Sequence, residues 1–129
     1  MKLNILVSGG LHDSQAGYSA WEFCRAALAQ GHDITQVFFY QQGVSQATQL
    51  AVPLTDEFDA TEAWATLSSE ADIPLVVCVS AAERRGVLNE EQRLEAEKAV
   101  SNLHAGFEIA GLGSLHEASL ASDRTVSFR

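Results

Sequence analysis

A continuous apolar run, Leu75-Val76-Val77-Cys78-Val79, constrains the fold of this chain more than any other stretch. It is rich in β-branched residues and does not alternate with polar ones, which is typical of a strand covered on both faces in a parallel sheet. Pro74 precedes it, where a strand tolerates a missing N–H. Ser80 and Glu83 then have the spacing of a capping box and predict a helix start. We therefore expect Cys78 at the carboxyl end of a buried strand, beside a helix N-terminus.

Cys78 has two interpretations at this point. In open α/β sheets, ligands bind and chemistry occurs at the carboxyl edge of the strands. A helix start adds a partial positive charge and free N–H groups, which favour a thiolate over a thiol. Arg84 and Arg85 would strengthen this effect if they fold back. Alternatively, Cys78 is a small core residue, because free cysteines are among the most buried residue types. Position alone leaves both interpretations open.

Strand-like and helix-like segments alternate along the rest of the chain. Further strands are expected at residues 3–7, 33–40, 107–110 and 124–128, and helices at 14–30, 44–50, 59–71, 89–101 and 114–121. This alternation predicts a single α/β domain over residues 1–129, with a flavodoxin- or Rossmann-like parallel sheet of five strands and helices on both faces. The common strand order 2-1-3-4-5 would bring the loop 9–13 next to Cys78.

Charge and cysteine content narrow the function classes. The formal net charge of −9 opposes direct binding to nucleic acid, whose affinity comes largely from Lys and Arg on phosphates. The apolar run near Met1 is too short for a signal peptide or a membrane span, so we expect a cytoplasmic protein. The two cysteines lack C-x-x-C spacing and indicate free thiols rather than a disulfide framework or a zinc site. Cys24 shares the apolar stripe of its helix with Trp21 and Leu28, which assigns it to the core.

Motifs for nucleotide, hydrolase and metal chemistry are missing. Gly9, Gly10 and Gly17 do not form G-x-G-x-x-G, and no P-loop or G-x-S-x-G elbow occurs. The four histidines have no ligand spacing, so we expect no metal and interpret each as a surface or capping residue. His12 and Asp13 would adjoin Cys78 in the expected strand order, and a Cys-His pair would activate the thiol. A polar loop without that role is the interpretation we favour.

Short segments in a characteristic order run along nearly the whole chain. They are Val37-Phe38-Phe39-Tyr40 with Gly43-Val44, Asp56-Glu57-Phe58-Asp59, Cys78-Val79-Ser80-Ala81-Ala82 with Arg84-Arg85-Gly86-Val87, Ser101-Asn102-Leu103 with Gly106-Phe107, and Gly111-Leu112-Gly113-Ser114-Leu115 through Glu117-Ala118-Ser119 to Asp123-Arg124. Together they resemble the DsrE/DsrF-like family, and within it the TusD branch. The order and spacing of the segments are more specific than any one of them.

The resemblance implies a sulfurtransferase whose catalytic cysteine is Cys78. This residue would accept sulfane sulfur as a persulfide and pass it on, in a relay for 2-thiolation of the wobble uridine of tRNA. The implied partners are TusB- and TusC-like subunits in a heterohexamer, a TusA-like sulfur donor and a TusE-like acceptor. No metal, organic cofactor, membrane or direct nucleic-acid contact is needed. His12 and Asp13 do not belong to the family pattern, so no role is transferred to them.

Three other interpretations stay open. In the first, the chain is a DsrE-type subunit of a DsrEFH complex in dissimilatory sulfur oxidation. In the second, it is a non-catalytic scaffold subunit with Cys78 buried and inert. The third is a small nucleotide- or flavin-binding module, which only the Ser8-Gly9-Gly10 loop supports. For a carrier, we expect Cys78 in a shallow pocket within reach of a partner's cysteine. The acidic segment 56–59 would steer basic partners, with a solvated loop as the alternative.

Overall fold

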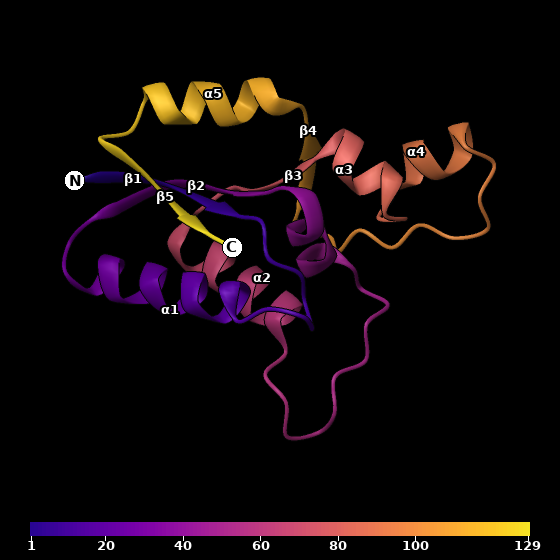
Figure 1. The fold of residues 1–129 in the computed structure, drawn as a ribbon, viewed down its shortest axis with the longest axis horizontal. Helices are drawn as coiled ribbons and strands as arrows, with labels where there is room; N and C mark the ends of the chain where they lie inside the picture. The colour runs from indigo at the N-terminus through magenta and orange to yellow at the C-terminus, as the bar shows by residue number, and fades with distance from the viewer.

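Five parallel strands form one sheet in the computed structural model, which describes residues 1–129. The order across the sheet is β4-β3-β2-β1-β5 (Figure 1). The strands are β1 (Lys2–Val7), β2 (Asp33–Phe39), β3 (Leu75–Cys78), β4 (Glu108–Ala110) and β5 (Arg124–Phe128). Every pairing between neighbours is parallel.

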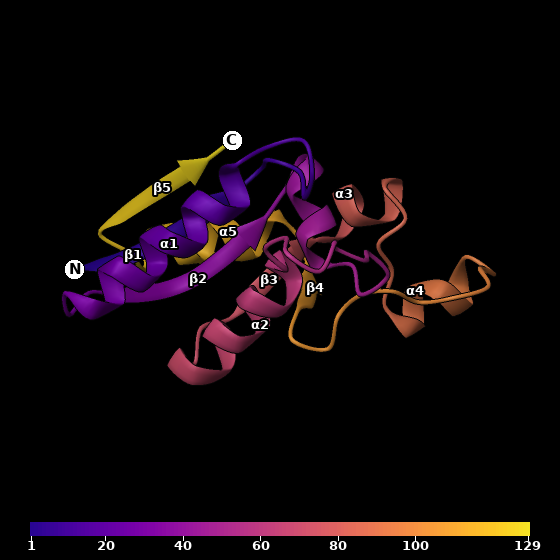
Figure 2. The ribbon, with the colours of Figure 1, turned by 90° about the horizontal axis from the view of Figure 1, so that it is seen from below.

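Helices cover both faces of the sheet. Figures 1 and 2 show α1 (Ala16–Ala29) and α2 (Ala60–Ala71) on one face and α5 (Leu112–Leu120) on the other. Three short helices lie toward the carboxyl ends of the central strands: the 3-10 helix η1 (Gln41–Ala47), α3 (Val79–Arg84) and α4 (Glu90–Glu95). The predicted fold class, a parallel five-stranded α/β sheet with helices on both faces, is confirmed.

The predicted strand order 2-1-3-4-5 is wrong. Strands β1 to β4 follow one another across the sheet in chain order, and β5 returns to pair with β1. β2 therefore lies between β1 and β3, as an interior strand. The continuous apolar run Val37-Phe38-Phe39 was the signal for this position, because an interior strand needs apolar residues on both faces. The alternating segment Arg124–Phe128 is an edge strand.

The two sheet faces differ in how they hold their helices. Phe39 packs edge-on against Trp64 of α2, with ring centroids 5.4 Å apart, and both side chains are fully buried. Burying side chains of this kind contributes about 1.5–3 kcal/mol each. On the opposite face, Gln36 donates to the carbonyl of Ser114 and accepts from its hydroxyl, both at 3.2 Å. An apolar layer thus holds α2, whereas polar contacts help to hold α5.

Two predicted helices have different bounds in the structure. The segment expected to be helical at 44–50 is the 3-10 helix η1, which begins earlier and ends at Ala47. The helix expected at 89–101 ends at Glu95 as α4, because Glu97 adopts a left-handed backbone with φ of 56°. Leu94 and Val100 are exposed, so no apolar stripe extends this helix along the core. No helix in the structure has the length and apolar character needed to cross a bilayer.

Candidate functional site

Cys78 is the last residue of β3 and the N-cap residue of α3. Its backbone is extended, with φ −63° and ψ 122°, and it is paired in register with Ala110 of β4. The predicted strand-to-helix junction at this cysteine is therefore confirmed. It lies at the carboxyl edge of the sheet, where open α/β proteins place their chemistry.

The predicted capping box at Ser80 is wrong. Helix α3 already begins at Val79, so Ser80 is its second residue and no side chain caps the helix start. The carboxylate of Glu83 instead accepts a hydrogen bond of 3.2 Å from the side chain of Gln92. The hydroxyl of Ser80 faces the cysteine, with its Oγ atom 3.6 Å from Sγ of Cys78. The spacing of Ser80 and Cys78, two residues apart across a helix start, was the sequence signal for this contact.

Cys78 is buried in the isolated chain. The residue is 1% exposed and belongs to the main apolar core, together with Ala81 and Ala82 of α3. The shallow pocket expected around it is not among the five main surface hollows, which are lined by other residues. Helix η1 packs against both β3 and α3 and so covers this strand end.

The two arginines at the C-terminal end of α3 do not fold back onto Cys78. The guanidinium group of Arg85 donates to the carbonyl of Ala81 at 3.3 Å, within its own helical turn. The side chain of Arg84 is exposed and forms neither a hydrogen bond nor an ion pair. The polar partner of the Cys78 sulfur is therefore Ser80 and not a cationic side chain.

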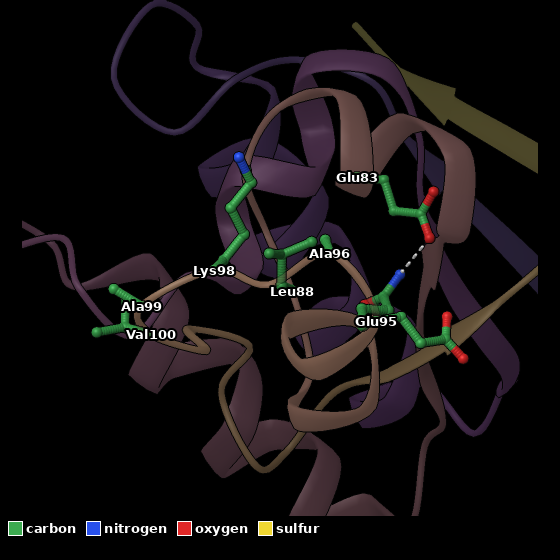
Figure 3. Close-up of a pocket in the computed structure, with 9 residues that line it drawn as sticks. Glu83, Leu88, Glu95, Ala96, Lys98, Ala99 and Val100 are labelled. Atoms are coloured by element: carbon green, nitrogen blue, oxygen red, sulfur yellow. Dashed lines mark hydrogen bonds between the residues drawn. The ribbon is translucent and has the colours of Figure 1, made fainter.

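A hollow of about 530 Å³ opens at the far end of α3. It lies between α3, α4 and the segment after α4, and includes Glu83, Leu88, Glu95 and Lys98 (Figure 3). In the close-up, the apolar side chain of Leu88 lies between Glu83 and Lys98. Because Cys78 is the N-cap residue of α3 and Glu83 is five residues further on, at ~1.5 Å per residue this hollow begins ~8 Å along the helix from the cysteine.

His12 and Asp13 are not brought next to Cys78. They follow β1, which is separated from β3 by β2, so the ends of these strands are ~10 Å apart at the usual strand spacing. Helix η1 lies between these two strand ends. The hydroxyl of Ser45 in η1 accepts a hydrogen bond of 2.8 Å from the N–H of Leu11. His12 lines a separate hollow of about 400 Å³ together with Tyr18. A Cys-His pair is therefore not formed.

Cys24, the second cysteine, lies in the core, as its place on the apolar stripe of its helix predicts. Cys24 is fully buried in α1, and burial raises its pKa to about 12.

Among the histidines, His104 accepts from the N–H of Gly106 through Nδ1 and contacts the carboxylate of Glu62 through Nε2, both at 2.9 Å. No group of three or more potential ligand side chains is arranged to hold a metal ion.

The fold and the cysteine-bearing strand end define a class: parallel α/β proteins with a thiol at the carboxyl edge of an interior strand. The model of the DsrE/DsrF-like family matches residues 1–128. The chain belongs to the DsrE/DsrF-like family.

Curated relatives match over almost the full length of the chain. A protein named sulfurtransferase TusD homolog, from Vibrio parahaemolyticus, is 47% identical over 124 residues, covering 96% of this chain and 95% of its own. Sulfurtransferase TusD from Proteus mirabilis is 48% identical with the same coverage. Sulfurtransferase TusD from Klebsiella pneumoniae is 44% identical over 128 residues, covering 99% of this chain and all of its own.

Two solved structures share the fold at low sequence identity. The ychN protein from E. coli has a TM-score of 0.79 at 17% identity, covering 99% of both chains. A protein of unknown function from Methanobacterium thermoautotrophicum has a TM-score of 0.68 at 10% identity, covering 98% of this chain and 97% of its own. At these identities the similarity concerns the fold alone.

Proposed function

We propose that this chain is a sulfurtransferase subunit that carries sulfane sulfur as a persulfide on Cys78. The observation that carries the proposal is the 44–48% identity to relatives named sulfurtransferase TusD over nearly their whole length. Cys78 lies at the carboxyl edge of the sheet, with the Ser80 hydroxyl 3.6 Å from its sulfur, and this position supports the choice of Cys78 over Cys24. Cys24 lies in the core with a raised pKa and is poorly suited to nucleophilic attack.

The proposed chemistry is two thiol exchanges. In the first, the Cys78 thiolate attacks the outer sulfur of a donor persulfide, a new S–S bond forms, and the donor leaves as a thiolate. In the second, an acceptor thiolate attacks the outer sulfur of the Cys78 persulfide, and Cys78 leaves as a thiolate. One sulfur atom moves, and no net oxidation or reduction occurs. The exchange therefore requires no metal or organic cofactor.

The proposed setting is a protein relay in the cytoplasm. By analogy with the TusD branch, the donor is TusA-like and the acceptor TusE-like, the chain assembles with TusB- and TusC-like subunits in a heterohexamer, and the relay serves 2-thiolation of the tRNA wobble uridine. Because Cys78 is 1% exposed in the isolated chain, this proposal also requires that a partner or a local opening uncovers the sulfur.

Burial of Cys78 favours one rival function, that of a non-catalytic scaffold subunit. A buried cysteine is an ordinary core residue, and a scaffold needs no route to it. The two functions differ in the assembled state: a carrier exposes Cys78 to a partner's thiol, whereas a scaffold keeps it protected there as well.

Intact-mass measurement separates these functions. The parent chain and Cys78→Ser, each co-purified with its TusB- and TusC-like subunits, are incubated with a persulfide-loaded TusA-like donor. We expect the parent alone to gain one sulfur atom, about 32 Da, and to lose it on reduction. Cys24→Ser is the matched control and should gain sulfur like the parent. If no variant gains sulfur in the complex, the scaffold function is supported, and equal gain in the parent and Cys78→Ser would implicate Cys24.

A further inference from the structure

The segment 50–58 between η1 and α2, here called the apolar arm, concentrates exposed hydrophobic side chains. Val52 is 89% exposed, Leu54 67%, Leu50 58% and Phe58 39%, so four of the ten large exposed hydrophobic residues lie within nine positions. In Figure 1 this segment runs out from the body of the molecule before it enters α2. Exposed apolar side chains gathered in this way are typical of interaction sites, whereas single ones are ordinary.

The arm has a defined conformation despite its exposure. The residue just before the arm is fixed by a backbone hydrogen bond of 2.7 Å, which the N–H of Gln49 donates to the carbonyl of Asn102. Near its tip, Leu54 and Glu57 form two bonds of 3.0 Å, one from the N–H of Leu54 to the Glu57 carboxylate and one between backbones. Ala51 and Pro53 are turned inward and line a small hollow. The alternate residues Leu50, Val52 and Leu54 consequently face solvent, as in an extended strand.

The arm belongs to a strongly acidic part of the chain. Between residues 26 and 83 there are eight Asp or Glu residues and no Lys or Arg. Asp56, Glu57 and Asp59 lie in or directly beside the arm, and no ion pair involves any of them. A partner that covers this surface must therefore bring positive charge, because unpaired carboxylates are costly to bury.

The hollow beside the arm has the lining that a cationic side chain requires. It measures about 400 Å³, and Tyr18 and Phe58 line it with ring centroids 5.0 Å apart. Glu57 is also in its wall. Gln46, a buried residue of η1, also contributes to its wall. Aromatic rings and an acidic residue in one wall favour a guanidinium or ammonium group.

We propose that the apolar arm and this hollow form a docking surface for a different protein, which presents an apolar contact to Leu50, Val52 and Leu54 and inserts an Arg or Lys side chain beside Tyr18 and Glu57. The proposal rests on the proposed function in one respect, that a sulfur carrier works in a protein complex. A second copy of this chain is a poor occupant, because its own net charge is −9 and like charges at an interface repel. The hollow beside α4 lacks this match, since Lys98 lies in its wall.

The first test measures assembly with purified TusB- and TusC-like subunits from the same host. We expect the double variant Val52→Ser, Leu54→Ser to bind them at least tenfold more weakly than the parent in calorimetry. Leu94→Ser, Val100→Ser is the matched control, because it removes two exposed apolar side chains near α4. Equal affinity for the parent and the arm variant would overturn the proposal, as would a parent homodimer that the arm variant abolishes.

The second test isolates the cationic anchor and uses N-acetyl-arginine amide as the probe, with the citrulline analogue as its uncharged control. In NMR titration of the full chain, we expect saturable shifts at Tyr18, Gln46 and Phe58 with the arginine probe only, and at least a threefold weaker effect for Glu57→Gln. Equal shifts with both probes would overturn the proposed anchor. Sulfur loading of Cys78 from a small-molecule persulfide, compared at subunit concentrations that saturate both the parent and the arm variant Val52→Ser, Leu54→Ser, should be the same in the two complexes. Failure of sulfur transfer and failure of docking therefore give different results.

Discussion

The Sγ atom of Cys78 lies 3.6 Å from the Oγ atom of Ser80, across the first turn of α3. Cys78 is buried and Ser80 is exposed, so the sulfur lies beneath a solvent-facing residue that can donate a hydrogen bond to it. A thiolate or persulfide at this position is an anion, and a hydroxyl donor stabilises it more than it stabilises the neutral thiol.

Ser80→Ala should therefore slow the reaction of Cys78 near neutral pH. Loss of one hydrogen bond of about 1 kcal/mol corresponds to about a fivefold lower rate of sulfur loading in the assembled complex. The rate is measured by intact mass against time at several pH values. Ser80→Thr keeps the hydroxyl and should react like the parent. A Ser80→Ala rate equal to that of the parent at all pH values would mean that the hydroxyl does not act on the sulfur.

Cys24 should make the stability of the protein depend on alkaline pH. Burial raises the pKa of its thiol from 9.0 to about 12 in the folded chain, so above about pH 9 the unfolded chain loses a proton that the folded chain keeps. The free energy of unfolding then falls with rising pH between about 9 and 12, by up to about 1.4 kcal/mol per pH unit. Urea unfolding between pH 8 and 10.5 should show a steeper decline for the parent than for Cys24→Ala. Parallel declines in both proteins would contradict the burial effect.

Gly43 permits the close approach of η1 to the end of β1. A Cβ atom at this position would overlap the carbonyl oxygen of Val7, which is backbone and cannot rotate away. Gly43→Ala should therefore lower the free energy of unfolding by about 3 kcal/mol, as overpacking does. Gly113→Ala is the matched control, since nothing lies within 4 Å of its new Cβ and α5 should gain up to about 0.5–1 kcal/mol. Urea denaturation measures both, and equal effects would exclude the steric explanation.

Asn89 holds the start of α4 through a capping box. Its carboxamide oxygen accepts from the N–H of Gln92 at 2.8 Å, and the Gln92 side chain accepts from the N–H of Asn89 at 2.9 Å. Asn89→Ala should cost about 1 kcal/mol and loosen this short helix, while Asn89→Asp should retain the cap. Hydrogen exchange at the amides of Arg93 and Ala96 measures the effect. Unchanged protection in the alanine variant would show that tertiary contacts hold α4 instead.

The local features around Cys78 could be predicted because they depend on neighbours in sequence. The run Leu75–Val79 indicates a strand covered on both faces, and a helix follows it within a few residues. The capping box at Ser80 was mispredicted because the helix begins at Val79, with Cys78 rather than Ser80 as its N-cap, and Glu83 bonds to Gln92 instead. Similarly, the expected helix at 89–101 ends early because its apolar residues have no core to cover.

The hollow beside the apolar arm could not be predicted in this way. Its lining residues Tyr18, Gln46 and Phe58 come from three separate parts of the chain, and no motif joins them. The exposed residues of the arm gave a weak signal, since apolar residues at 50, 52 and 54 normally indicate a half-buried strand. Only the structure shows that these side chains face solvent.

The sequence by itself determined the elements, the alternation that makes the sheet parallel, the membership in the DsrE/DsrF-like family, and Cys78 as the candidate residue. These depend on short-range patterns of apolar, polar and turn residues. The tertiary structure alone decided the strand order, the separation of His12 from Cys78 and the burial of the Cys78 sulfur. Those depend on which distant strands pair and on how η1 packs over β3, and pairing between distant segments leaves no periodic trace in the sequence.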